Sequence, residues 1–116
     1  MENSIAYEKS RQFAIRVICL YKHLTEDRHE YVMSKQLLRS GTSIGANLAE
    51  ARRAISRADF LAKVYIALKE CSETDYWLDI LHETSFISDP EYFSLHSSCE
   101  EIIRILTATT RTMSKD

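Results

Sequence analysis

The segment Gln36–Ala51, with the sequence QLLRSGTSIGANLAEA, decides the fold class of this chain. It is long enough for four helical turns, and it has no charged residue from Ser40 to Ala49, although 28% of the chain is charged. On a helical wheel it carries three stripes where a surface helix needs one apolar stripe. The stripes are Leu37, Gly41, Ile44, Leu48 and Ala51; Gln36, Ser40, Ser43, Asn47 and Glu50; and Leu38, Thr42, Gly45 and Ala49. We therefore expect this helix to pack against neighbours on several sides.

Outward from this segment, the remaining sequence is also helical in pattern. The chain has only two glycines and one proline, which leaves little turn chemistry for a β-sheet. The patterns predict helices over about 4–24, 30–53, 56–83 and 89–113, joined by short connections. Short connections make consecutive helices antiparallel. We expect an all-α fold, an antiparallel up-down-up-down four-helix bundle, with residues 1–116 forming one domain.

Helix ends and core faces can be placed from local signals. Ser56 and Asp59 form a Ser-x-x-Asp capping pattern at the start of the third helix, and Asp89-Pro90 predicts an N-cap before a first-turn proline. The predicted core faces are Phe13, Val17, Leu20 and Leu24 in the first helix; Phe60, Val64, Ala67, Cys71, Thr74, Leu78 and Leu81 in the third, at strict heptad spacing; and Tyr92 or Phe93, Leu95, Cys99, Ile102, Leu106 and Met113 in the fourth.

Charge and cysteine content limit the classes of protein that fit. The net charge is −2, but residues 1–69 hold 12 Lys+Arg and 7 Asp+Glu, whereas residues 70–116 hold 3 and 10. Halves of opposite charge favour self-complementary packing, or a basic surface for an anionic partner. Cys19, Cys71 and Cys99 are odd in number and lack zinc-type spacing, so we expect reduced packing residues. No apolar run could span a bilayer, and residues 1–10 lack the apolar centre of a signal peptide. These features predict a cytoplasmic protein with no membrane partner.

Two motifs of enzymes occur without the structure that their chemistry needs. Gly41-Thr42-Ser43-Ile44-Gly45 matches the Gly-x-Ser-x-Gly nucleophile elbow, but that motif works on a strand-to-helix turn beside a sheet, and none is predicted here. Two glycines one turn apart more simply allow another helix to approach closely. Glu26-x-x-His29 and Asp79-x-x-His82 resemble di-iron bundle ligands, but one falls in a loop and the other at a helix end. We expect no catalytic residue, no metal site and no cofactor. His23 and His96 have no evident partner in the sequence, and Glu70, Glu73, Asp75, Asp79 and Glu83 are spread over several helix faces, as on a solvated surface.

Three sets of residues are candidates for binding. The small and polar stripes of the second helix predict a subunit interface of Gln36, Ser40, Thr42, Ser43, Gly45, Asn47, Ala49 and Glu50. A basic set could bind phosphate or a neighbour's carboxylates, and comprises Lys9, Arg11, Arg16, Lys35, Arg39, Arg52, Arg53 and Arg57. Tyr65, Lys69 and Tyr76, with Ala62 and Ile80 nearby, share a face of the third helix away from its core. That face could stack nucleic-acid bases, but a second packing surface explains it more simply.

The central segment, followed by Phe60, Lys69-Glu70 and Tyr76-Trp77-Leu78, strongly resembles the bacterial four-helix bundle protein family, also known as the ribosomal RNA intervening-sequence proteins. The resemblance covers nearly the whole chain. It implies a four-helix bundle that assembles into a ring-shaped homopentamer. It also implies kinship with the accessory variability determinant of diversity-generating retroelements, a basic pentamer that binds nucleic acid and a reverse transcriptase. This chain differs from that relative in its slightly acidic charge.

We therefore expect a non-enzymatic, homo-oligomeric interaction or scaffold module whose main partner is itself. The alternative is an accessory protein that binds RNA or DNA weakly and without sequence preference, and a protein partner is also compatible with the surface. A metal-dependent enzyme is the remote third reading.

Overall fold

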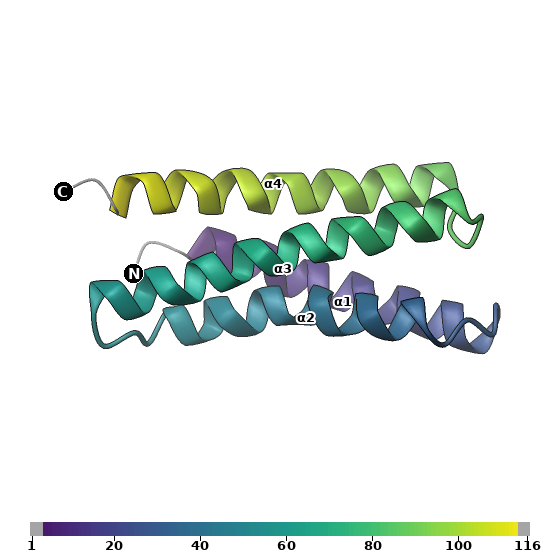
Figure 1. The fold of residues 1–116 in the computed structure, drawn as a ribbon, viewed down its shortest axis with the longest axis horizontal. Coiled ribbons are helices and arrows are strands. Elements are labelled where there is room, and N and C mark those ends of the chain that lie inside the picture. Colours follow the sequence, from purple (N-terminus) through teal and green to yellow (C-terminus); the bar gives the residue numbers. More distant parts are fainter. Residues whose placement is uncertain (1–3, 114–116) are drawn as a thin grey trace.

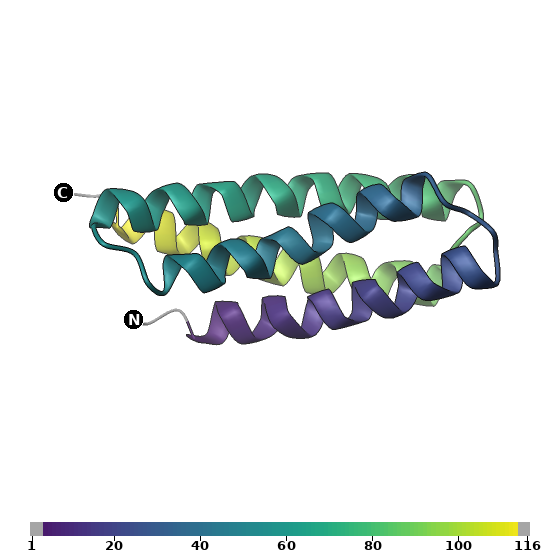
Figure 2. The same cartoon turned by 90° about the horizontal axis from the view of Figure 1, so that it is seen from below.

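The computed structural model describes residues 4–113, and they form four α-helices with no strand among them. The helices are α1 (Ser4–Glu26), α2 (Met33–Ala51), α3 (Arg57–Glu83) and α4 (Asp89–Met113). Figures 1 and 2 show them running alternately up and down along one long axis. The beginning of α1, the end of α4 and the α2–α3 connection lie at one end of the bundle, and the other two connections lie at the opposite end. The predicted all-α antiparallel bundle is confirmed. None of the helices is long and apolar enough to cross a membrane.

The helices pack around one core that the heptad and wheel patterns predicted. The seven heptad residues of α3, from Phe60 to Leu81, are all buried, as is the apolar stripe of α2. In α4 the predicted alternatives separate: Tyr92 packs against the core, while Phe93 is exposed. The helices contact one another in the ring order α1, α2, α3, α4, and the α1–α4 side is the sparsest. The outer faces of α2 and α3 therefore lie on the surface of the chain.

Two glycines of α2 bring this helix close to α1. An added Cβ at Gly41 would lie 2.9 Å from both γ-carbons of Val17, and one at Gly45 would lie 3.3 Å from Ser10 Oγ. The expectation of a close helix approach at these glycines is confirmed. The neighbour that approaches is α1 of the same chain.

The beginning of α2 differs from the sequence-based boundary. The helix was expected to begin near Glu30 but begins at Met33. The Glu30 carboxylate accepts hydrogen bonds from the backbone N–H groups of Val32, Met33 and Ser34, and so caps the first turn from outside the helix. The preceding residue, His29, has a positive φ of 55°, which reverses the chain before the cap. Glu30 therefore lies three residues before the first residue of α2, although its sequence position resembles that of a first-turn residue.

The caps of α3 and α4 are set by serines. The Ser56 hydroxyl accepts from the Asp59 N–H, so the predicted Ser-x-x-Asp cap is confirmed. The Asp59 carboxylate also accepts from the N–H of Ile55, the residue before the cap. At α4 the cap is Ser88, whose hydroxyl accepts from the Glu91 N–H. Asp89 was expected in that role, but its carboxylate lies 2.6 Å from His82 Nε2 instead.

Candidate interaction surface

A second stripe runs along α3 opposite its core. We call it the α3 outer face, and it comprises Ala62, Tyr65, Ile66, Lys69, Tyr76 and Ile80. Tyr65 is 47% exposed, Ile66 40% and Tyr76 55%. Tyr65 and Tyr76 are eleven residues apart, which is about 16 Å along a helix. Large apolar side chains at this density on one face are typical of surfaces that contact another protein.

Ile66 is the member of this face that the sequence reasoning did not single out. With Ile66, positions 62, 66, 69, 73, 76 and 80 follow a spacing of four and three residues that parallels the core heptad, with Glu73 as the charged member between Lys69 and Tyr76. That second heptad was the signal that could have identified it. The sequence does not predict whether Ile66 is exposed, because apolar residues on two opposite sides of a helix are also found when both sides are buried.

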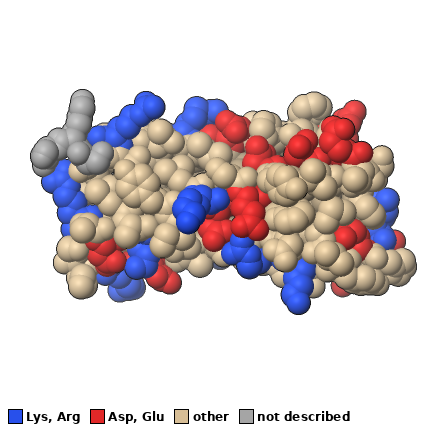
Figure 3. Space-filling view, viewed as in Figure 1, with Lys and Arg blue, Asp and Glu red and all other residues tan. Residues whose placement is uncertain are grey.

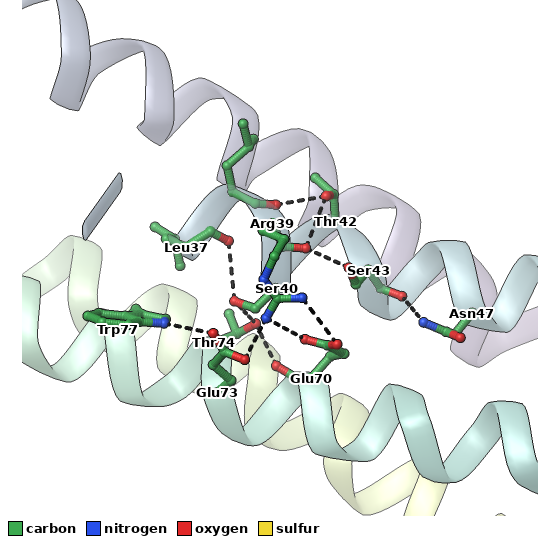
Figure 4. A network of polar contacts seen from close by, with 11 residues as sticks. Leu37, Arg39, Ser40, Thr42, Ser43, Asn47, Glu70, Glu73, Thr74 and Trp77 are labelled. Carbon is green, nitrogen blue, oxygen red and sulfur yellow. Dashed lines mark hydrogen bonds and ion pairs between the residues drawn. The ribbon is translucent and has the colours of Figure 1, made fainter. Parts of the chain in front are cut away.

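The surface in view in Figure 3 is largely uncharged on either side of a central group of basic and acidic atoms. Figure 4 shows a network in which Arg39 of α2 reaches across to α3. Arg39 Nη2 lies 2.5 Å from Glu73 Oε1 and 3.2 Å from Glu70 Oε1, and Nη1 donates to Glu70 Oε2. Trp77 Nε1 donates to the second Glu73 oxygen at 3.0 Å. The network ties the outer edges of the two helices together.

The electrostatics of the network follow from these hydrogen bonds. The bond from Trp77, and then those from Arg39, hold the pKa of Glu73 below its ordinary value. Glu70 and then Glu73 raise the pKa of Arg39. The Arg39 charge is therefore engaged by carboxylates of its own chain.

The predicted subunit-interface residues separate into two groups. Ser40 and Gly45 are buried inside the chain, Ser40 against Thr74 of α3 and Gly45 against Ser10 of α1. These two positions are therefore covered by helices of the same chain. The others remain on the surface, half-buried or exposed: Gln36, Thr42, Ser43, Asn47, Ala49 and Glu50.

The polar side chains of this α2 surface are mostly satisfied by their own helix. The Ser43 hydroxyl donates to the Arg39 backbone oxygen at 2.6 Å, Thr42 to that of Leu38, and the Asn47 amide to that of Ser43 (Figure 4). Ser43 thus sits within a continuous helix and not on a strand-to-helix turn. The Gly-x-Ser-x-Gly match has none of the elbow geometry that a nucleophilic serine requires.

The basic set is not one continuous patch. Lys9 pairs with Glu101 at 3.1 Å, Arg16 donates to Ser94 and Ser98, and Arg57 donates to the Met113 backbone oxygen. The Arg52 guanidinium lies 4.1 Å above the Tyr7 ring. The side chains of Arg11, Lys35 and Arg53 form no hydrogen bond or ion pair with the described part of the chain. Figure 3 shows basic atoms gathered towards the end that carries the α2–α3 connection, where Arg52, Arg53 and Arg57 lie.

The histidines have partners that the sequence did not reveal. His23 Nδ1 lies 2.9 Å from Asp27, one turn later, and His96 Nδ1 lies 2.7 Å from Asp75 of α3. The two motifs that resemble di-iron ligands, Glu26-x-x-His29 and Asp79-x-x-His82, form no pair within themselves. His29 contacts Tyr31, and His82 contacts Asp89. His82 and Asp89 line an open hollow of about 530 Å³ at the end of the bundle, together with Arg28. Arg28 donates there to the backbone oxygens of Ser85 and Phe86.

Comparison with known proteins agrees with this architecture. A crystal structure of a protein of unknown function from the S23 ribosomal protein family of Bacteroides thetaiotaomicron VPI-5482 is 50% identical to the chain, covering 90% of this chain and 97% of that one, with a TM-score of 0.89. No curated protein matches the chain significantly. Neither the description of the similar structure nor that of the matching family names an enzymatic activity. Residues 2–108 match the family described as 23S rRNA-intervening sequence protein, and the chain belongs to that family.

Proposed function

We propose that this protein is a non-enzymatic, homo-oligomeric interaction module, in which the α3 outer face of one copy packs against the α2 surface of the next. The observation that supports it most is the exposure of Tyr65, Ile66 and Tyr76 on one side of α3. Aromatic residues on such a face lose little conformational entropy on binding and bury large apolar areas.

The exposed side of α2, which lies beside the α3 outer face, carries small side chains that could receive large ones. Its outward residues include Thr42, Ala46 and Ala49, whose small side chains leave room for the tyrosines of a second copy. A contact between two different faces is head-to-tail, and such contacts produce closed rings when the rotation between copies closes. The homopentamer implied by the family resemblance is a ring of this kind.

The test is a mass measurement in solution with matched tyrosine variants. We expect light scattering on the purified protein at micromolar concentration to give a multiple of 13.4 kDa, with five copies as the predicted number. The double variant Tyr65→Lys/Tyr76→Lys should shift the mass towards one copy, because a charge buried without a partner opposes association. Tyr31→Lys is the control, since Tyr31 is an exposed tyrosine in the α1–α2 connection. A wild-type mass of one chain would refute the proposal.

A second candidate function is weak binding of RNA or DNA without sequence preference. It is favoured by Arg52 and Arg53 at one end of the bundle, where neither side chain is paired with a carboxylate of the described residues. A ring would repeat this end around its axis, so that modest charge per copy adds up by multivalency. Retardation of a nucleic acid at low salt should decline steeply as salt increases. It should also decline in Arg52→Glu/Arg53→Glu but not in Arg39→Gln, because Arg39 is already engaged by Glu70 and Glu73.

We also propose that the protein acts in the cytoplasm. Its three cysteines are free thiols, two of them buried, which suits a reducing compartment.

A further inference from the structure

Three side chains able to bind a metal ion meet between α3 and α4. They are Asp75 of α3 and His96 and Glu100 of α4, all half-buried. One ligand atom of each lies within 4.8 Å of the others. His96 and Glu100 are four residues apart, so both project from the same side of α4 towards Asp75. No other group of this kind exists among residues 4–113.

No Lys or Arg of the described residues forms an ion pair with Asp75 or Glu100. Residues 70–103 contain nine Asp and Glu and no Lys or Arg. Asp75 contacts the His96 ring, and Glu100 forms no hydrogen bond or ion pair with the described residues. Lys9 of α1 pairs instead with the adjacent Glu101. Two carboxylates therefore lie beside one imidazole, and Arg104, one turn after Glu100 on α4, forms no ion pair with either of them.

Aromatic stacking fixes the orientation of the His96 ring. The Tyr92 ring stacks on His96, with centroids 5.4 Å apart and planes at 13°. His82 stacks on Tyr92 in turn, with centroids 4.3 Å apart. Stacking of this kind limits rotation of the His96 ring and so lowers the entropy lost when a ligand binds it.

We propose that Asp75, His96 and Glu100 bind a divalent transition-metal ion such as Zn²⁺. One imidazole nitrogen and two carboxylate oxygens suit such an ion, and water would fill the remaining positions. His96 would coordinate through Nδ1, the nitrogen that faces Asp75, while its ring proton resides on Nε2. Neighbouring ligands on tetrahedral zinc are about 3.4 Å apart, so small movements of the half-buried carboxylates complete the site. The ion would link α3 to α4.

The test is calorimetric titration of untagged, metal-free protein with zinc chloride, with magnesium chloride as the comparison. We expect one zinc ion per chain with a dissociation constant in the micromolar range or below, a higher midpoint of thermal unfolding with zinc, and no comparable effect of magnesium. Ions that bind only the folded state raise its stability. Binding should also weaken as pH falls below neutrality, since protons compete for the same atoms.

Three variants identify the site. Glu100→Gln should keep the fold, because Glu100 contacts no other described side chain through hydrogen bonds, and should weaken zinc binding at least about tenfold. His96→Gln should weaken it further, with circular dichroism as the check on folding. His23→Gln is the control, since His23 is also paired with an Asp, one turn away on α1. The proposal is overturned if wild-type protein binds no zinc at submillimolar concentrations, or if Glu100→Gln and folded His96→Gln bind it as the wild type does.

Discussion

The hydroxyl oxygens of Ser40 on α2 and Thr74 on α3 lie 2.9 Å apart inside the bundle and are joined by a hydrogen bond (Figure 4). Both side chains are fully buried. Thr74 Oγ1 also lies 2.7 Å from the Glu70 backbone oxygen, whereas Ser40 Oγ has only a long contact of 3.4 Å to that of Leu37. Ser40 therefore depends on Thr74 more than Thr74 depends on Ser40.

A double-mutant cycle should reveal this dependence. We expect Thr74→Val to lower the free energy of unfolding by about 1–2 kcal/mol, because it leaves the Ser40 hydroxyl buried without a good partner. Ser40→Ala should cost less, since Thr74 keeps its bond to Glu70. The double variant should cost less than the sum of the two, which denaturant unfolding can measure. Strictly additive values would show that the hydroxyls are not energetically coupled.

The two glycines of α2 should differ in their tolerance of alanine. At Gly41 the new methyl group meets Val17 at 2.9 Å, so Gly41→Ala should destabilise by about 1–3 kcal/mol despite the gain in helix propensity. At Gly45 the nearest atom is Ser10 Oγ at 3.3 Å, so Gly45→Ala should be close to neutral. Adding Val17→Ala should reduce the cost of Gly41→Ala, as thermal unfolding can show. An equal cost at both glycines would contradict the packing described above.

The Glu30 cap should make stability depend on pH. Burial acts to raise the Glu30 pKa, but hydrogen bonds from the backbone of Met33, Ser34 and Val32 outweigh it and lower the pKa below its ordinary 4.5. A carboxylate whose pKa is lower in the folded state stabilises the fold fully above the unfolded pKa, and this contribution is lost as pH falls through the folded pKa. Glu30→Ala should therefore cost about 0.5–2 kcal/mol at neutral pH, by analogy with other caps.

The control for this prediction is Glu26→Ala at the exposed end of α1. Unfolding by denaturant at neutral pH and again well below pH 4.5 should show a gap between wild type and Glu30→Ala that narrows in acid. A gap of constant size would mean that the charge of Glu30 contributes nothing to the cap.

The three thiols should react very differently with alkylating reagents. Contact with Cys71 and burial raise the pKa of Cys99, and both residues lie in the core, whereas Cys19 is exposed on α1. Because the thiolate is the reactive form, native protein should be modified once, at Cys19. Denatured protein should be modified three times, and Cys19→Ser should remove the native reaction. Mass spectrometry after labelling can count the groups, and rapid native labelling of Cys99 would contradict the burial.

Much of the fold could be predicted from spacing alone. The heptad from Phe60 to Leu81 and the Ser56 cap are local patterns, since each depends only on which residues follow one another along a helix. For the same reason the sequence identified the buried stripe of α2 and the need for close approach at Gly41. The first residues of α2 and the cap of α4 differed from the prediction, because Glu30 and Ser88 accept hydrogen bonds from the first turns while lying outside the helices.

Contacts between helices were decided only by the tertiary structure. A wheel places Ser40 and Arg39 on one helix, but it does not say which neighbour each will face. In the packed bundle, Ser40 faces inward and contacts Thr74. Arg39 contacts Glu70 and Glu73, which lie more than thirty positions away in the sequence. The crossing and register of two helices depend on all the side chains between them, and so are not encoded in any short segment.

The sequence by itself thus determined the four helices, their core faces and the family of this protein. The tertiary structure decided that His96 pairs with Asp75, through the packing of α4 on α3. It also decided that Ser40 and Gly45 are buried within one chain, through the packing of α3 and α1 on α2. Hydrophobic periodicity is local and survives any rotation of the bundle, whereas a distance between two side chains on different helices exists only after the helices have packed.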